Sequence, residues 1–107
     1  MQTVQQSPAW SSTALIVLWD ESGGWYDHVP PPQLPNSAGL GARVPVIVIS
    51  PFAKPGAISH QQMDLVSILR FIQWNWGLGT FTDPAQPARE QQSGDLRDLL
   101  SIPCSPP

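Results

Sequence analysis

The sequence predicts an α/β fold, and three observations support this class. Six apolar residues run without a polar break from Ala14 to Trp19, and a second apolar run covers Val44–Ile49. Apolar runs of this length, bounded by turn residues, are typical of strands that are buried on both faces. After Ser59 the apolar residues instead recur at the spacing of a helix. We therefore expect core strands over Ala14–Trp19 and Val46–Ile49, with a helix over Gln61–Trp76 packed on them.

The expected helix has sequence signals at both ends. Ser59, with Gln62 three residues later, forms a capping-box pattern, and Gly77 suits the C′ position. The apolar residues between them form one stripe that we interpret as a core face: Leu65, Ile68, Leu69, Ile72 and Trp76. His60 would lie in the first turn, near the positive end of the helix dipole, where it could contact an anionic substrate. An ordinary surface histidine is the alternative interpretation.

Two acidic residues, Asp20 and Glu21, follow the first expected strand. Neighbouring side chains of a strand point to opposite faces, so the two carboxylates can converge only if the backbone curls. Gly23 and Gly24 permit the positive φ values that such a curl needs. Desolvated paired carboxylates repel each other unless a cation compensates them, and oxygen ligands suit a divalent metal ion. A plain polar turn after a core strand is the alternative.

A long irregular loop separates the two expected strands. From Ser22 to Arg43 the sequence has no sustained helical or alternating pattern, which is typical of a functional loop because ordinary connections are shorter. His28 lies in this loop, and the prolines that follow favour extended polyproline geometry. An alternative function is a non-catalytic interaction module that presents the proline-rich loop Val29–Pro35 to an SH3 or WW domain.

Length and composition limit the possible functions. The chain has 107 residues, which we divide into a polar segment at 1–12, a body at 13–100 with a short helix near Asp95–Leu100, and a proline-rich tail at 101–107. The formal net charge of −3 gives no basic surface for nucleic acid. No apolar run approaches the ~18–20 residues of a transmembrane segment. Met1–Trp10 lacks the basic residues and apolar core of a signal peptide, so the compartment stays open.

A longer stretch carries a more specific pattern. Residues Thr13–Pro32 read TALIVLWDESGGWYDHVPPP: an apolar strand, then Asp-Glu-x-Gly-Gly-x-Tyr-Asp-His-Val and a proline run. This stretch resembles the signature of the phosphoesterase family, which holds bacterial and plant non-specific phospholipases C and acid phosphatases. Further matches to the family pattern are Gly39–Gly56, Ser59–Leu78 and Gly94–Leu96. The resemblance therefore extends over most of the chain.

The resemblance implies a metal-assisted hydrolase that acts on phosphate esters. It assigns Asp20 and Glu21 to a divalent metal ion, whose identity stays open. It assigns His28 to a catalytic role, in which the imidazole hydrogen-bonds a phosphoryl oxygen or protonates the leaving group. His60 is a further candidate for substrate binding. The substrate would be a phosphate monoester or a phospholipid.

The resemblance also implies a larger fold than this chain can build. Family members look like relatives of the alkaline phosphatases, in which helices sandwich a central sheet, and two strands with one helix supply only part of that arrangement. Their N-terminal half carries a Glu-Asn metal motif, a Ser or Thr nucleophile and an Asp-Asp-His-Pro segment, and we find none of these in this sequence. We therefore expect a C-terminal portion of a larger domain, whose partner is the missing N-terminal half and which is inactive alone. Parent proteins in this family are often exported.

Overall fold

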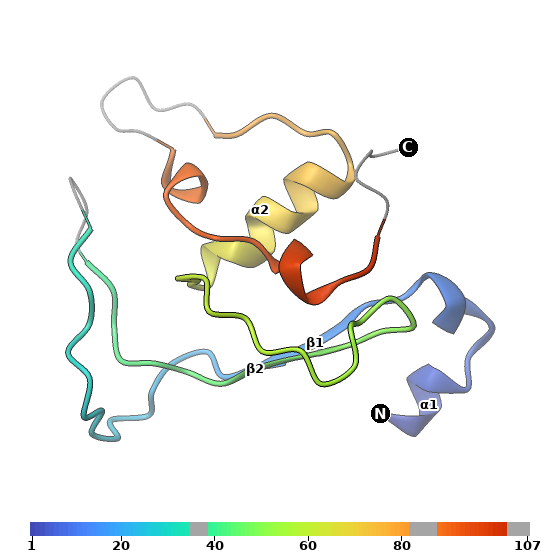
Figure 1. The fold of residues 1–107 in the computed structure, drawn as a ribbon, viewed down its shortest axis with the longest axis horizontal. Coiled ribbons are helices and arrows are strands. Elements are labelled where there is room, and N and C mark those ends of the chain that lie inside the picture. The colour runs from blue at the N-terminus through green and yellow to red at the C-terminus, as the bar shows by residue number, and fades with distance from the viewer. Residues whose placement is uncertain (35–38, 82–87, 103–107) are drawn as a thin grey trace.

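The structure is a computed structural model that describes residues 1–34, 39–81 and 88–102. Figure 1 shows a two-stranded sheet along one side of the molecule and helix α2 with the C-terminal segment on the other. The elements are α1 (Gln2–Gln5), η1 (Pro8–Ser12), β1 (Leu15–Leu18), β2 (Val46–Ile49), α2 (Val66–Asn75), η2 (Arg89–Gln91) and η3 (Leu96–Leu99), where η marks a 3-10 turn. The predicted α/β class is confirmed in this small form. Among the described residues no helix has the length and apolar character needed to span a bilayer.

The two strands lie where the sequence predicts them, and they pair antiparallel with Leu18 opposite Val46. The prediction that they are buried on both faces is wrong, because Val17, Val46 and Ile47 are exposed, Ile47 by 57%. The sheet of the described chain has only two strands, and α2 packs mainly on η2 and η3, not on the strands as predicted. Antiparallel pairing also brings the residues that follow β1 to the same edge as the residues that precede β2.

Helix α2 begins at Val66, later than the predicted Gln61. Asp64 Oδ1 accepts the Val66 amide hydrogen at 2.9 Å, and Ser67 Oγ accepts the Asp64 amide hydrogen at 3.0 Å. These two bonds satisfy amide groups at the start of the helix, which have no partner within the helix itself. Asp64 with Ser67 therefore performs the capping that the sequence pattern had assigned to residues nearer the N-terminus.

The predicted capping box of Ser59 does not form. The Ser59 hydroxyl donates to Asp98 Oδ2 in η3, and its oxygen accepts the Gln61 amide hydrogen at 3.2 Å. Ser59 thus ties the segment before α2 to the C-terminal turn. His60 consequently lies on exposed irregular chain ahead of the helix, and its predicted place in a helical first turn is wrong.

The C-terminal end of α2 agrees with the sequence. Gly77 has a φ of +61° and donates its amide hydrogen to the Trp74 carbonyl at 3.3 Å. The Leu78 amide donates to the Gln73 carbonyl at 2.8 Å. This pair of bonds is the Schellman arrangement, in which glycine at C′ adopts a left-handed conformation without steric cost.

The fully buried residues of α2 are polar, whereas most of the predicted apolar core face is exposed. Ser67 and Gln73 are buried, whereas Leu65, Ile72 and Trp76 are exposed, Trp76 by 65%. At 3.6 residues per turn the exposed apolar residues share one side of the helix, away from Ser67. Ile68 and Leu69 are half-buried, so the predicted core face is covered only in part in the described chain.

The core of the described chain is small and mostly polar. Leu96 and Leu100 are the buried apolar side chains, with exposed fractions of 2% and 4%. The buried polar residues are Ser67, Gln73, Glu90, Ser93 and Asp95. A β-bridge between Ala53 and Leu100 joins this core to the turn after β2. The expected short helix near Asp95–Leu100 is thus the 3-10 turn η3, and it lies at the centre of the packing.

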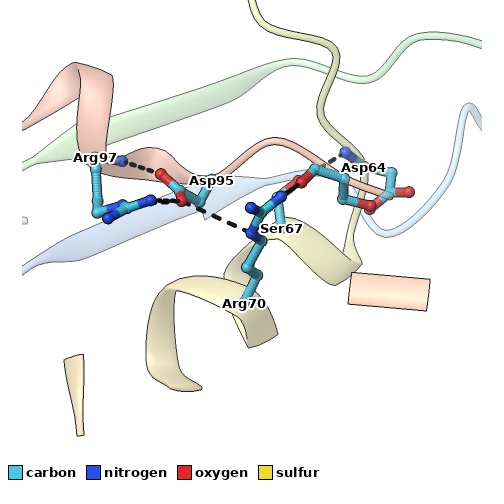
Figure 2. A network of polar contacts seen from close by, with 6 residues as sticks. Asp64, Ser67, Arg70, Asp95 and Arg97 are labelled. Atoms are coloured by element: carbon cyan, nitrogen blue, oxygen red, sulfur yellow. Dashed lines mark hydrogen bonds and ion pairs between the residues drawn. The ribbon is translucent and has the colours of Figure 1, made fainter. Parts of the chain in front are cut away.

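Ion pairs hold the polar core together, as Figure 2 shows around Asp95. Asp95 Oδ2 lies 2.7 Å from Arg97 Nη2 and 3.8 Å from Arg70 Nε. Burial by itself would raise the pKa of Asp95, but hydrogen bonds from Arg97 outweigh it and the net pKa is lowered. On the far side of the network, Asp64 pairs with Arg89 at 2.6 Å. These contacts link α2 to η2 and η3.

Candidate active site

Asp20 and Glu21 follow β1, with only Trp19 between them and the last strand residue. They line one open hollow of about 420 Å³, whose remaining wall residues are Leu18, Trp19, Ser22, Gly23 and Trp25. Both residues thus line the same hollow, and the convergence of their two carboxylates stays a prediction. The expected desolvation is not observed, because both residues are exposed to solvent. Asp20 Oδ1 accepts the Glu21 amide hydrogen at 3.1 Å.

A tight turn at Gly23 and Gly24 produces this arrangement. Their φ values are +64° and +79°, and the Trp25 amide donates to the Ser22 carbonyl at 3.2 Å across them. Two successive positive φ values fit a type I′ turn, which residues with a side chain rarely adopt. The predicted backbone curl at the glycine pair is confirmed. It reverses the chain immediately after the acidic residues.

An ion pair fastens the loop further along. Both carboxylate oxygens of Asp27 accept hydrogen bonds from Arg43, whose Nη2 lies 2.8 Å from Oδ1 and whose Nε lies 3.0 Å from Oδ2. The Arg43 amide also donates to Oδ2 at 2.9 Å, and the Val29 amide donates to Oδ1 at 3.0 Å. The side-chain hydrogen bond from Arg43 is the largest cause that holds the pKa of Asp27 well below its usual range. Asp27 is therefore an anion fixed by two segments of the chain.

His28 lies between Asp27 and Val29, the two residues joined by the hydrogen bond from the Val29 amide to the Asp27 carboxylate. Its ring is exposed and meets Tyr26 edge-on, with ring centroids 5.1 Å apart and an interplanar angle of 90°. His28 lines a second open hollow of about 460 Å³. Trp19, Ser22 and Trp25 belong to both hollows, so the acidic residues and His28 lie on adjoining concave surfaces.

His60 belongs to neither hollow. It is exposed on the segment that Ser59 ties to η3, in the half of the chain built around α2. The structure therefore brings three of the four predicted site residues to one end of the sheet and leaves the fourth apart.

The part of the sequence that forms this site matches a known protein family. The sequence model of the Phosphoesterase family matches residues 1–79, which include both strands, the acidic residues and His28. The chain belongs to the phosphoesterase family.

Among curated relatives, this phosphoesterase chain is 32% identical to the non-hemolytic phospholipase C of Pseudomonas aeruginosa, over an alignment that is 123 positions long with its gaps. It is 34% identical to phospholipase C B of Mycobacterium tuberculosis over 130 alignment positions. It is 39% identical to non-specific phospholipase C1 of Arabidopsis thaliana over 75 alignment positions. These matches cover 87%, 99% and 56% of this chain, but only 18%, 25% and 14% of the relatives. The chain thus spans at most a quarter of these relatives. No solved structure matches.

Sequence reasoning gave Asp27 and Arg43 of this phosphoesterase no role. Arg43 is the first Lys or Arg residue of the chain, and Asp20, Glu21 and Asp27 are the acidic residues that precede it. That charge pattern was available, but the sequence separation of Asp27 and Arg43 gave no reason to pair them. The pairing follows from antiparallel strand order, which returns the chain to the edge where it left β1.

The chemistry of the acidic residues fits a hard or borderline divalent cation. Two exposed carboxylate residues that line one open hollow offer oxygen donors of the kind that such cations prefer. In the described part of the chain no third His, Cys, Asp or Glu joins them to make a ligand cluster. Asp20 and Glu21 can therefore supply part of a coordination sphere.

Proposed function

We propose that this chain forms one wall of a metal-assisted active site that hydrolyses phosphate esters. The observation that carries the proposal is the shared hollow of Asp20 and Glu21 at the end of β1, next to the hollow of His28. This constellation falls within the stretch matched by the Phosphoesterase family. Carboxylates beside an imidazole at the end of a strand suit phosphoryl chemistry, because the acids bind a cation and the imidazole handles a proton.

Asp20 and Glu21 hold the cation in this proposal. The glycine turn follows directly after these residues, and both of them line the same hollow, which supports a shared role. When bound, a divalent cation supplies Lewis-acid stabilisation of the negative charge that develops on a phosphoryl group. The exposure of the two carboxylates leaves room for ligands and substrate groups from outside this chain.

His28 is the proton-transfer or hydrogen-bonding group. An imidazole can pass a proton to a leaving-group oxygen or donate a hydrogen bond to a phosphoryl oxygen. His28 lines the hollow that adjoins the acidic one, and in this proposal a phosphate ester lies across both hollows. His60 has no part in this arrangement.

The nucleophile belongs to a part of the domain outside this chain. Ser50 is the hydroxyl at the end of β2, but it donates to the Thr13 carbonyl at 2.9 Å and accepts the Phe52 amide at 3.2 Å, which is a structural role. The missing N-terminal half would complete an alkaline-phosphatase-like sandwich around the sheet. The exposed apolar residues of the sheet and of α2 support this proposal, because exposed apolar surface is a site for contact with another segment.

The names of the relatives support a choice of substrate class. Their names describe phospholipases C, which makes a phospholipid phosphodiester the first candidate and a phosphate monoester the second. The pocket walls that separate the two substrates lie partly outside this chain. Activity on phosphatidylcholine against activity on p-nitrophenyl phosphate distinguishes them.

The test of this function is Asp20→Ala in the full-length parent. We expect turnover of phosphate esters to fall by about a hundredfold to a thousandfold and metal affinity to fall as well, because a cation ligand is removed. The control is Gln5→Ala, which removes an exposed side chain of α1 far along the sheet from the acids and should keep turnover and metal. Near-normal turnover in Asp20→Ala would remove the acidic pair from the site.

A further inference from the structure

We propose that Asp27 and Arg43 are positioning residues for His28. They fix the loop that carries the imidazole to the segment that leads into β2. The inference rests on the proposed function, since it concerns the placement of the proton-handling group of that site. It adds two residues to which the analysis of the sequence gave no role.

The Asp27 carboxylate is hydrogen-bonded across His28, to the backbone of the residue that follows it. One neighbour of His28 is Asp27 itself, and the other is Val29, whose amide donates to Asp27 Oδ1 at 3.0 Å. The residues on both sides of the imidazole are therefore tied to a single carboxylate. A rotation of the backbone at His28 would break the Val29 bond or pull the carboxylate away from Arg43.

Arg43 anchors the carboxylate to a different part of the chain. Its guanidinium contacts both oxygens through Nε and Nη2, and its own amide donates to Oδ2 at 2.9 Å. A planar guanidinium that grips both oxygens of a carboxylate has a defined geometry, which a single point charge lacks. Arg43 follows the long loop and precedes β2, so the pair closes that loop across the edge of the sheet.

Most ion pairs at a protein surface contribute little, but this one differs in two respects. The Asp27 side chain is only 13% exposed, although the Arg43 side chain is 69% exposed. Both carboxylate oxygens are also used, with two backbone amides among the donors. An ordinary surface pair holds two flexible side chains together, whereas this pair fixes backbone on both sides of a functional residue.

The ring of His28 has a reporter beside it. Tyr26 lies edge-on to the imidazole at a centroid distance of 5.1 Å. The chain contains one tyrosine and two histidines, so a nuclear Overhauser contact between their rings has few possible assignments. The His60→Gln variant identifies the His28 signals. We expect a contact between Tyr26 and His28 in the wild-type chain.

The first arm of the test measures this ring contact in variants of the ion pair. We expect Asp27→Asn to lose it, because the charged hydrogen bonds are lost. Arg43→Lys keeps the positive charge but loses the bidentate hydrogen bonding to Asp27, and we expect a weakened contact between the Tyr26 and His28 rings. The matched control is Asp20→Asn, which should keep the contact. Persistence of the contact in a folded Asp27→Asn chain overturns the inference, and if that variant unfolds, an unweakened contact in Arg43→Lys does so.

The second arm measures kinetics in the full-length parent. We expect Asp27→Asn to lower kcat by about tenfold to a hundredfold with little change in KM, because a small misplacement of a catalytic group has effects of this size. An unchanged kcat with a lost ring contact overturns the inference but leaves the proposed function standing. Full turnover in Asp20→Asn overturns the proposed function, whatever the ring contact does.

Discussion

Gly94 meets the segment before α2 so closely that a single added methyl group should destabilise the fold. A Cβ at Gly94 would lie 2.8 Å from the Gln62 carbonyl oxygen, 3.0 Å from Gln61 Oε1 and 3.3 Å from Gln61 Cβ. The first of these distances is the decisive one, because real Cβ atoms essentially never approach another atom so closely. The Gln61 side chain can rotate away, but the Gln62 carbonyl is backbone.

The Gln62 carbonyl is also the acceptor of the Gly94 amide hydrogen, at 2.9 Å. Relief of the clash therefore stretches the hydrogen bond that joins the two segments. Overpacking costs about 1–3 kcal/mol and a lost hydrogen bond about 0.5–1.5 kcal/mol, so we expect Gly94→Ala to destabilise the fold by about 2–3 kcal/mol. For a domain of this size such a change lowers Tm by about 8 °C or more.

Thermal unfolding followed by circular dichroism measures this effect. Gly41→Ala is the matched control, because a Cβ at Gly41 meets no atom within 4 Å and needs no left-handed backbone. We expect the Tm of Gly41→Ala to equal or slightly exceed that of the wild type, since alanine restricts the unfolded chain. Equal Tm values for the two variants would refute the argument that close approach selects glycine at position 94.

Two further predictions concern carboxylates. Glu90 is 2% exposed. Its carboxylate accepts hydrogen bonds from Gln73 Nε2 at 3.0 Å and from the Phe81 amide at 2.6 Å. The Gln73 bond is the largest cause that lowers the pKa of Glu90. Glu90→Ala leaves both donors unpaired and should lower the free energy of unfolding, measured in urea, by about 2–4 kcal/mol. A decrease below about 0.5 kcal/mol would exclude a structural role for Glu90. The lowered pKa of Asp27 means that the folded state holds its proton less tightly than the unfolded state. Its pairing with Arg43 should therefore stabilise the fold above pH ~4 and lose that effect as pH falls further, so the Tm difference between wild type and Asp27→Asn should shrink in acid. A difference that is the same at pH 3 and pH 7 would contradict this assignment.

The sequence predicted those features that depend on local chemistry. The apolar runs identified both strands, and Gly77 identified the end of α2, because each signal acts within a few residues. The glycine pair likewise identified the curl after Asp20. These predictions needed no knowledge of the remaining chain.

The features that the sequence did not predict depend on which segments meet in space. Ser59 and Asp64 both offer an oxygen for capping. Because α2 begins only at Val66, Asp64 lies next to the first helical amides, whereas Ser59 accepts the Gln61 amide ahead of the helix. The apolar stripe of α2 satisfies the local criteria for a core face, yet three of its five residues are exposed, because η2 and η3 cover only part of the helix. Local pattern gives the faces of a helix but does not say which face a neighbour will cover.

The acidic pair illustrates the same limit within the site. Residue types suggested a desolvated pair that needs a cation, whereas both carboxylates are exposed in this chain. Desolvation depends on what lies over Asp20 and Glu21, and local sequence contains no information on that cover. The same reasoning explains why Arg43 escaped notice, since its partner is brought to it by strand pairing.

The central claim is that this chain supplies one wall of a phosphoesterase site and needs the rest of the domain for turnover. The most direct measurement compares the purified 107-residue chain with the full-length parent, at equal concentration and with divalent metal, on p-nitrophenyl phosphate and phosphatidylcholine. We predict hydrolysis by the parent and none by the chain alone, because the nucleophile and the remaining ligands must be held with sub-ångström accuracy around the same substrate. Hydrolysis by a monodisperse preparation of the 107-residue chain would contradict the account, since the nucleophile would then lie within these residues.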